Sequence, residues 1–316
     1  MITARGVPIS PRKSLASRIK EQWPLWVFLF PGLISFFLFS YFPFYGVITA
    51  FQIYSPVRGI LNSRWVGLEN FKYILVLPTF TNALRNTLVI SFLKLFFCFP
   101  MPIMFALMLN EIHSTRYKRT IQTITYLPHF LSWVVAAGIW YRLLSPYNGA
   151  LNHLLVSLGI IKESYNIIGD PSAFYFVLII SDLWKGVSWG SIIYLAAITA
   201  VNPELYEAAV VDGASRLRQT WHITLPGIKP TIVLMLIMAV SNLLNAGFDQ
   251  IANMTNRAVL EVGDILDTLI LRTLTVGSAR DMSIGTAMGI MKSMSGLLLF
   301  IIANTFSRVL LDESLI

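Results

Sequence analysis

The sequence predicts an all-α integral membrane protein with six transmembrane helices. Of its 316 residues, 55% are hydrophobic and only 13% are charged, whereas a soluble domain carries about 25% charged residues. The mean hydropathy is +0.66, and residues 22–57 contain no Lys, Arg, Asp or Glu. This run exceeds the ~20 apolar residues that a helix needs to cross the hydrocarbon core of a bilayer. We therefore expect much of the protein surface to face lipid.

The first span is expected at residues 25–51. A cleavable signal peptide also has a basic start, but its apolar region has only about 7–15 residues. Basic residues precede the span in a tail at residues 1–24, namely Arg5, Arg12, Lys13, Arg18 and Lys20. Because basic segments tend to stay on the cytoplasmic side, the amino terminus is expected in the cytoplasm.

Long apolar windows predict the other spans at 87–109, 121–143, 173–200, 231–253 and 284–306. With six crossings, the carboxyl end at 307–316 is also cytoplasmic. Basic residues are somewhat more frequent in the expected inner segments than in the longer outer loops, which agrees with this orientation. No low-complexity linker, internal repeat or second soluble domain is recognisable.

Several function classes are excluded by the composition. The net charge of +8 is spread thinly and forms no basic block for nucleic acid. The single cysteine, Cys98, excludes an intrachain disulfide. No histidine has a carboxylate or cysteine at metal-ligand spacing, and no nucleophile–base or paired-carboxylate arrangement is recognisable. No Gly-Lys dipeptide occurs, so the chain has no phosphate-binding loop. We expect no catalytic residue, no metal and no cofactor in this chain.

The longest inner loop, at residues 201–230, carries the most information. Asn202 and Pro203 form a typical helix start, and Asp212-Gly213 a helix stop. A second helix is expected from residue 215 to 225, ended by Pro226, with Lys229-Pro230 opening the next span. Two helices are more than a connection between two membrane spans needs, because such a connection can be only a few residues long. The element is either a docking surface for another protein or a solvated pair of helices.

The residues of this loop carry a resemblance. The loop contains Glu207-Ala208-Ala209, followed after three residues by Gly213, after nine more by Ile223 and after one more by Leu225-Pro226. This pattern resembles the EAA loop of membrane subunits in binding-protein-dependent ATP-binding-cassette (ABC) importers. The six expected spans, with the loop between the fourth and fifth, resemble the carbohydrate-uptake branch of that family. We call residues 201–230 the EAA loop. The resemblance implies the transmembrane fold of type I ABC importers over residues 25–306.

In that family the EAA loop is the coupling helix, which lies in a cleft of a cytoplasmic ATPase. The resemblance implies that Glu207 makes the polar contact and that two small alanines allow close packing. The residues implied in coupling are Glu207, Ala208, Ala209, Asp212, Gly213, Ile223, Leu225 and Pro226. The implied partners are a second similar permease subunit, an ATPase dimer that uses ATP and Mg, and an extracytoplasmic solute-binding protein.

Polar residues inside the spans are the candidates for a solute pathway. In the fifth expected span, Asn242, Asn245, Asp249 and Asn253 recur at intervals of three and four, as on one helical face. They could hydrogen-bond a sugar or pack against neighbouring helices. In the fourth span the candidates are Trp184, Lys185 and Trp189, where either tryptophan could stack on a sugar ring or lie at the membrane interface.

The charge of the solute is left open by the sequence. The lysines at positions 94, 185 and 292 would suit a negative solute, whereas Asp182 and Asp249 argue against one. Asp182 and Lys185 could also pair with each other, since they lie three residues apart on a helix.

The sequence therefore predicts a non-catalytic permease subunit of the bacterial inner membrane that imports a sugar or oligosaccharide. The same resemblance includes importers of acidic polysaccharide fragments such as alginate or pectin oligosaccharides. The alternative is a secondary transporter driven by an ion gradient, in which Asp249 would be the coupling carboxylate, but the EAA loop would then have no purpose. A structural membrane scaffold is a second alternative, and a complex that contains only such a scaffold would show no solute-stimulated ATP turnover.

Overall fold

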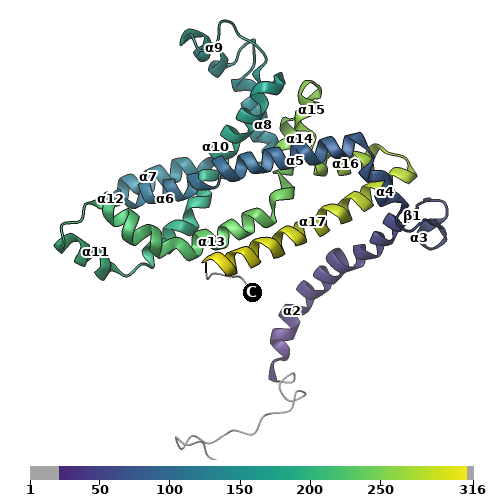
Figure 1. The fold of residues 1–316 in the computed structure, drawn as a ribbon, viewed down its shortest axis with the longest axis horizontal. Coiled ribbons are helices and arrows are strands. Elements are labelled where there is room, and N and C mark those ends of the chain that lie inside the picture. Colours follow the sequence, from purple (N-terminus) through teal and green to yellow (C-terminus); the bar gives the residue numbers. More distant parts are fainter. Residues whose placement is uncertain (1–20, 312–316) are drawn as a thin grey trace, which may run out of the picture.

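The computed structural model describes residues 21–311, with side chains to residue 306. The basic residues expected in the tail, and residues 312–316 of the carboxyl end, lie outside this range. Helices form most of the described chain (Figure 1). Its only strands are β1 (Gln52–Ile53) and β2 (Arg64–Trp65), which pair antiparallel with Gln52 opposite Trp65 and Ile53 opposite Arg64.

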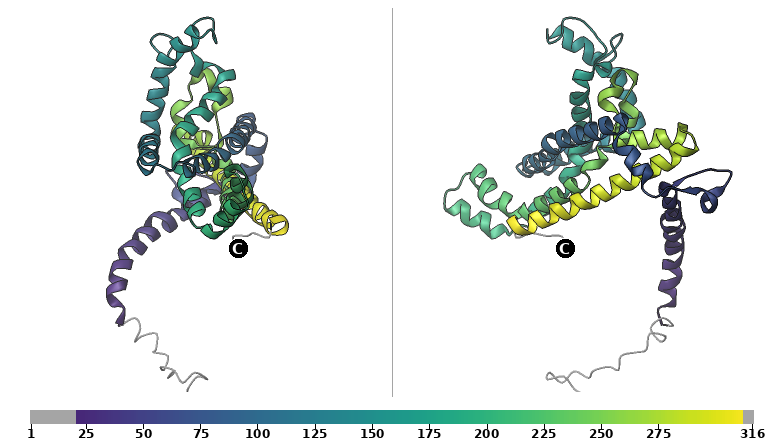
Figure 2. Two further views of the ribbon diagram at one scale, coloured as in Figure 1. Left: turned by 90° about the vertical axis from the view of Figure 1, so that its left-hand side faces the viewer. Right: turned by 45° about the vertical axis from the view of Figure 1, so that its right-hand side comes forward.

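The first expected span forms one continuous helical segment, Trp23–Phe51, because its residues are apolar throughout. It comprises α2 (Trp23–Phe36), the π-helical η1 (Phe37–Tyr41) and the 3-10 helix η2 (Phe42–Phe51). The segment α2 has no buried residue and extends away from the other helices, whereas η2 packs on α17 (Figures 1 and 2).

A short connection follows, with α3 (Gly59–Asn62) and α4 (Glu69–Leu75) around the strand pair. The buried Asn70 side-chain amide donates to the carbonyl oxygens of Ala50 and Gln52 at 2.8 and 2.9 Å. The Trp65 ring stacks on Phe51 with centroids 5.7 Å apart. These contacts fix the end of the first span.

The second span is longer than expected. It consists of α5 (Pro78–Phe97) and α6 (Pro100–Asn110), and Pro78 and Pro100 each begin a helix, where a missing N–H costs nothing. The apolar helical segment thus runs Pro78–Asn110 instead of 87–109.

The expectation of one continuous helix at 121–143 is wrong. This part of the chain forms α7 (Thr115–Tyr126), the 3-10 turn η3 (Leu127–Phe130) and α8 (Trp133–Leu143). Pro128 lies at the start of η3, and the Ser132 hydroxyl accepts the Val135 N–H and caps a new helix. Within the described residues, five helical segments are long and apolar enough to cross a membrane, Trp23–Phe51, Pro78–Asn110, Pro171–Thr199, Arg216–Ser241 and Ala279–Phe306.

The long helix α10 (Pro171–Thr199) is central to the packing. Asp170 caps its first turn and Pro171 occupies the first position. The helix packs against α6, η3, η4 (Ile167–Gly169) and α13 (Leu225–Ser241). Helix α9 (Ala150–Ser157), which precedes η4 in the chain, packs against α8. One hydrophobic cluster gathers around Phe174, which is fully buried.

The second half of the EAA loop joins the next span without a break. Helix α12 (Arg216–Gln219), the π-helical η5 (Thr220–Thr224) and α13 form one segment, Arg216–Ser241. Pro226 therefore does not end the helix, and Lys229-Pro230 does not open a new one. The π turn directly before α13 widens the helix, which accommodates a proline that lacks the N–H of a regular turn.

The fifth expected span is interrupted in its middle. Helix α13 ends at Ser241, and η6 (Leu243–Asn245) and a left-handed pair, Ala246 with φ 41° and Gly247 with φ 86°, precede α14 (Phe248–Met254). The chain then passes η7 (Arg257–Val259), α15 (Leu260–Gly263) and α16 (Leu266–Val276) to α17 (Ala279–Leu311). Helix α17 packs against α13 and α16.

Candidate functional site

The first helix of the EAA loop, α11 (Pro203–Val211), begins and ends as its sequence predicts. The Asn202 side chain accepts the Glu204 N–H at 3.0 Å. At the other end Gly213 has φ 70°, and the following N–H, of Ala214, donates to Ala209 O at 2.8 Å. A left-handed glycine of this kind satisfies the last carbonyl groups of a helix and turns the chain sharply.

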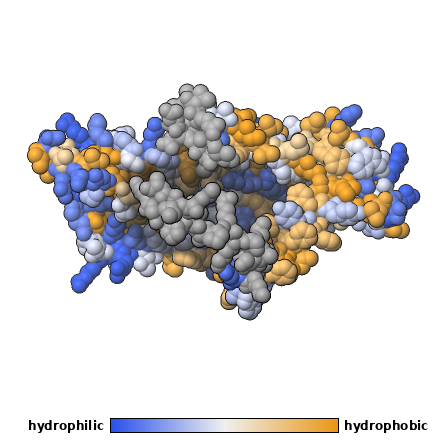
Figure 3. Space-filling model, turned by 90° about the horizontal axis from the view of Figure 1, so that it is seen from below, coloured by the Kyte–Doolittle hydropathy of each residue, from blue (hydrophilic) through white to orange (hydrophobic). Residues whose placement is uncertain are grey.

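Helix α11 has no buried residue. Glu207 and Ala208 are exposed and Ala209 is half-buried. Apolar neighbours are exposed as well, with Val210 at 63% and Val211 at 87%. Figure 3 shows hydrophilic and hydrophobic residues mixed at its left end, where α11 and α12 lie in Figure 1. An apolar surface of this kind, beside a carboxylate, suits contact with another protein.

Contacts between residues far apart in sequence hold the EAA loop in place, and no local sequence pattern predicts them. The Tyr206 hydroxyl and the buried Thr224 hydroxyl share a hydrogen bond of 2.9 Å. Arg216 donates to Glu111 at 3.2 Å and lies 2.6 Å from His113. Glu111 and His113 follow α6, so these contacts join two connections far apart in sequence.

The remaining predicted coupling residues lie on both sides of this loop. Asp212 and Gly213 form its exposed turn, and Pro226 is exposed. Ile223 is half-buried in η5, and Leu225 packs against the cluster of Ala106, Tyr194, Ile198 and Ile228. The motif thus joins an exposed helix to the packed end of α13.

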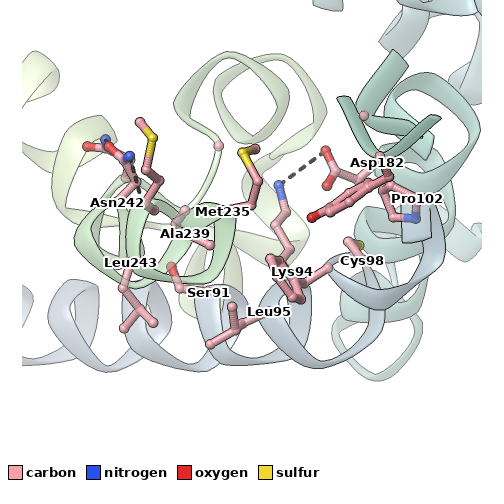
Figure 4. A pocket seen from close by; sticks show the side chains of 17 residues that line it. Ser91, Lys94, Leu95, Cys98, Pro102, Asp182, Met235, Ala239, Asn242 and Leu243 are labelled. Carbon is pink, nitrogen blue, oxygen red and sulfur yellow. Dashed lines mark hydrogen bonds and ion pairs between the residues drawn. The ribbon is translucent and has the colours of Figure 1, made fainter. Parts of the chain in front are cut away.

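A first cavity, of about 580 Å³, lies between α5, α6, α10 and α13. Lys94, Asp182, Tyr194 and Asn242 are among its lining residues. The Lys94 ammonium lies 3.6 Å from an Asp182 carboxylate oxygen (Figure 4) and also donates to the Gln250 side-chain oxygen. The cavity wall is mostly apolar, with a few polar groups at the interruption between α13 and α14.

The Gln250 side chain is fully buried and fully hydrogen-bonded. Its amide group donates to the Leu178 carbonyl oxygen at 2.7 Å and to the Ser181 hydroxyl at 2.8 Å. Because its oxygen accepts from Lys94, this glutamine connects α5, α10 and α14.

A second cavity, of about 440 Å³, lies on the other side of the interruption. Trp133, Asp249, Asp267 and Lys292 line it, and Asn245 and Gly247 line both cavities. The Lys292 ammonium donates to the Asn245 side-chain oxygen at 2.7 Å and to an Asp267 carboxylate oxygen. The two cavities therefore meet at the interrupted span.

The prediction that four polar residues form one helical face is wrong, because the helix does not continue past Ser241. Asn242 lines the first cavity, Asp249 the second and Asn245 both, so three of the four surround the interruption. Asn253 lines neither of these two cavities and donates to Asp249 O at 2.7 Å.

The candidates on α10 lie among aromatic side chains. Trp184 packs edge-on against Trp140, with centroids 6.0 Å apart. Trp189 stacks on the His129 ring, with centroids 4.3 Å apart and an interplanar angle of 4°. The Lys185 ammonium donates to His129 O at 2.7 Å and lies 5.5 Å from the Trp133 ring centroid. Asp182 pairs with Lys94, so the suggested pair between Asp182 and Lys185 is wrong.

Known proteins are similar to this chain over nearly its whole length. The Bacillus subtilis polygalacturonan/rhamnogalacturonan transport system permease protein YteP is 42% identical, over 96% of this chain and 94% of that protein. The B. subtilis protein LplB is 40% identical, over 95% of this chain and 93% of that protein.

A solved structure has the same fold. A chain of a bacterial ABC transporter involved in the import of the acidic polysaccharide alginate is 38% identical, with a TM-score of 0.85 over 94% of this chain and 99% of that chain. A chain of a bacterial alginate ABC transporter in complex with alginate pentasaccharide-bound periplasmic protein is 37% identical, also with a TM-score of 0.85.

The family described as binding-protein-dependent transport system inner membrane component matches residues 98–311. This range includes the EAA loop, all residues that line the second cavity, most of those that line the first, and the last four long helical segments in part or whole. The predictions of an all-α polytopic membrane fold and of an ABC importer permease are confirmed. The chain belongs to the family of inner membrane components of binding-protein-dependent transport systems.

Proposed function

We propose that this chain forms half of a translocation pathway and is paired with a second, similar membrane subunit. The observation that carries the proposal is the exposed helix α11, which presents Glu207, Ala208 and apolar side chains that nothing in the described chain covers. A permease needs such a surface to receive mechanical work from a motor.

The proposed motor is a cytoplasmic ABC ATPase dimer, which binds and hydrolyses ATP with Mg. Helix α11 would lie in a cleft of this ATPase, with Glu207 paired to a basic side chain and the small side chains of Ala208 and Ala209 allowing close approach. Closure of the ATPase dimer on ATP would move α11, and the helix segment Arg216–Ser241, which follows it, would transmit that movement to the cavities.

The proposed solute is a sugar or oligosaccharide, delivered by an extracytoplasmic binding protein. The names of similar proteins support this class, because they include permeases for arabinooligosaccharides and for trehalose and maltose besides those above. Fragments of acidic polysaccharides are part of the proposal, since one relative is named for polygalacturonan and the solved structures for alginate. The pathway candidates are Asn242, Asn245, Asp249, Trp184, Lys185 and Trp189, with Asn253 at its margin.

The protein is proposed to lie in the bacterial cytoplasmic membrane with both termini inside. This orientation would put α11 in the cytoplasm, where an ATPase can reach it. The basic residues of the tail support it. An ion-gradient-driven transporter is not proposed, because the similar solved structures are chains of ABC transporters.

Transport in proteoliposomes tests the proposal. The complex is purified from native membranes, reconstituted and given its binding protein with labelled oligosaccharides outside. We expect uptake to require ATP inside the vesicles and to persist without a proton or sodium gradient. Uptake driven by an imposed ion gradient in the absence of ATP would overturn the proposal.

A further inference from the structure

Three lysines of the long apolar helices lie at or near the two cavities: one lines the first cavity, one lines the second, and the third lies over the ring of Trp133, which lines the second. They are Lys94 on α5, Lys185 on α10 and Lys292 on α17. A charged ammonium is costly at membrane depth unless it has an anion or a polar cavity beside it. The groups around each lysine therefore indicate whether its charge is already paired within the chain.

Two of these lysines are neutralised within the chain. Lys94 lies 3.6 Å from an Asp182 carboxylate oxygen, and Lys292 donates to Asp267. Their remaining contacts are side-chain amide oxygens, of Gln250 and Asn245. Each pair has no net charge, so neither lysine offers an unbalanced positive charge to a solute.

Lys185 is different. No carboxylate oxygen of the described residues lies within 4.0 Å of its ammonium. Its contacts are the carbonyl oxygen of His129 and the face of the Trp133 ring. An ammonium has three N–H donors, and these two contacts leave at least one free. Lys185 thus forms no ion pair within the part of the chain that the structure describes.

The surroundings of Lys185 suit a sugar. Trp133, under its ammonium, lines the second cavity. On the neighbouring turn of α10, Trp189 is 45% exposed and is fixed by stacking on His129. Flat aromatic faces with a few polar groups are typical of sites that bind small ligands. The charged residues that line this cavity are Lys292 and Asp267, which pair with each other, and Asp249. Asp249 lies in the first turn of α14, where backbone N–H groups favour a carboxylate.

We propose that Lys185 is a specificity-determining residue that binds the carboxylate of an acidic sugar residue, a uronate, as the oligosaccharide passes the second cavity. In this arrangement the ammonium keeps its bond to His129 and donates a free N–H to the carboxylate. Trp133 and Trp189 border the sugar ring. The inference rests on the proposed function and names the solute class of the same pathway.

Uptake by the complete reconstituted complex, with binding protein at saturating concentration, tests this role. The probes are trimers of galacturonate and of mannuronate, each compared with its methyl ester, which has the same shape but no charge. The variant Lys185→Gln keeps a donor for His129 O but removes the charge, and Lys185→Arg keeps the charge. Lys162→Met removes a charge from an exposed position before η4 and serves as the control.

We expect Lys185→Gln to lower uptake of the acidic trimer roughly tenfold or more, since hydrogen bonds to charged groups are the strong ones. Lys185→Arg should keep most of the uptake, because arginine is always charged, and Lys162→Met should match the wild type. Where an ester is transported, its uptake should not depend on the charge at position 185.

Three results would overturn the role of Lys185 while leaving the permease function standing. The wild type could import neutral oligosaccharides but no uronate trimer. Lys185→Gln could import the acidic trimer at the wild-type rate. Lys185→Arg could fall as far as Lys185→Gln, which would mean that Lys185 only positions His129. A wild-type complex that imports no oligosaccharide with ATP would overturn the proposed function and this inference together.

Discussion

Gly247 combines two constraints in one residue. Its φ of 86° is in the left-handed region, which residues with a Cβ rarely adopt. A Cβ at this position would also collide with the Lys94 ammonium. The interruption between α13 and α14 therefore depends on a residue without a side chain, and it is here that both cavities meet.

The substitution Gly247→Ala tests this dependence. We expect it to destabilise the purified complex by about 1–3 kcal/mol, because the backbone is strained and Lys94 must leave its place beside Gln250 and Asp182. Thermal unfolding measures the effect. The matched control is Gly138→Ala in α8, where a Cβ meets nothing within 4 Å. Equal stability of the two variants would contradict the constraint.

The pair of Lys292 and Asp267 is a second test at this scale. Both side chains are mostly buried, with exposed fractions of 16% and 22%. Removing one partner of a buried ion pair costs about 3 kcal/mol or more, because the other charge stays uncompensated. We expect Lys292→Met to destabilise strongly and the double variant Lys292→Met with Asp267→Leu to recover most of the loss. A double variant no more stable than Lys292→Met would show that the two charges do not pair.

Among the helices, α11 is the element whose form follows most directly from its sequence. Its cap at Asn202, its proline and its glycine stop each have a local cause, so a short helix with a sharp turn was predictable. The contacts that hold it, between Tyr206 and Thr224 and between Arg216 and Glu111, join distant parts of the chain and leave no local pattern.

Substitutions in this element should separate transport from membrane insertion. Proline cannot adopt the φ of 70° found at Gly213, so Gly213→Pro should reposition α11 and abolish uptake. Glu207→Lys should do the same by reversing the charge of the docking surface. Both variants should reach the membrane at normal levels, measured by immunoblot beside uptake. Gly213→Ala, which is only strained, is the milder control. Full uptake by Gly213→Pro and Glu207→Lys would refute the coupling role.

The two interrupted spans mark the limit of what the sequence predicts. At 121–143 the break has local signals, Pro128 and the capping Ser132, which the apolar composition obscured. In the fifth span only Gly247 hints at a break, because the apolar pattern continues through it. The Asn and Asp spacing therefore predicts one face of a continuous helix, whereas α13 ends at Ser241.

At the scale of the whole molecule, the long helices were predictable because apolar length alone decides whether a helix can span a bilayer. The partners of the intramembrane lysines were not, since each lies on a helix far away in sequence: Lys94 pairs with Asp182 of α10, and Lys185 with His129 of η3. Charge balance in a membrane protein is a property of the assembled bundle.

The described chain also leaves large apolar surfaces uncovered. Helix α2 has no buried side chain, and α11 exposes Leu205, Val210 and Val211. Lipid accounts for exposed apolar side chains on a spanning segment, but α11 is not part of any described segment that is long and apolar enough to cross a membrane. We therefore propose that a protein partner covers α11.

Photo-cross-linking in native membranes tests this proposal most directly. A photoreactive phenylalanine analogue is placed at Ala208 and, in a second variant, at Val211, with Val57 as the exposed control before α3. We predict an adduct with an ATPase subunit, identified by peptides of its phosphate-binding loop, from positions 208 or 211 and none from position 57. Absence of such an adduct from both loop positions, or equal capture from position 57, would contradict the account.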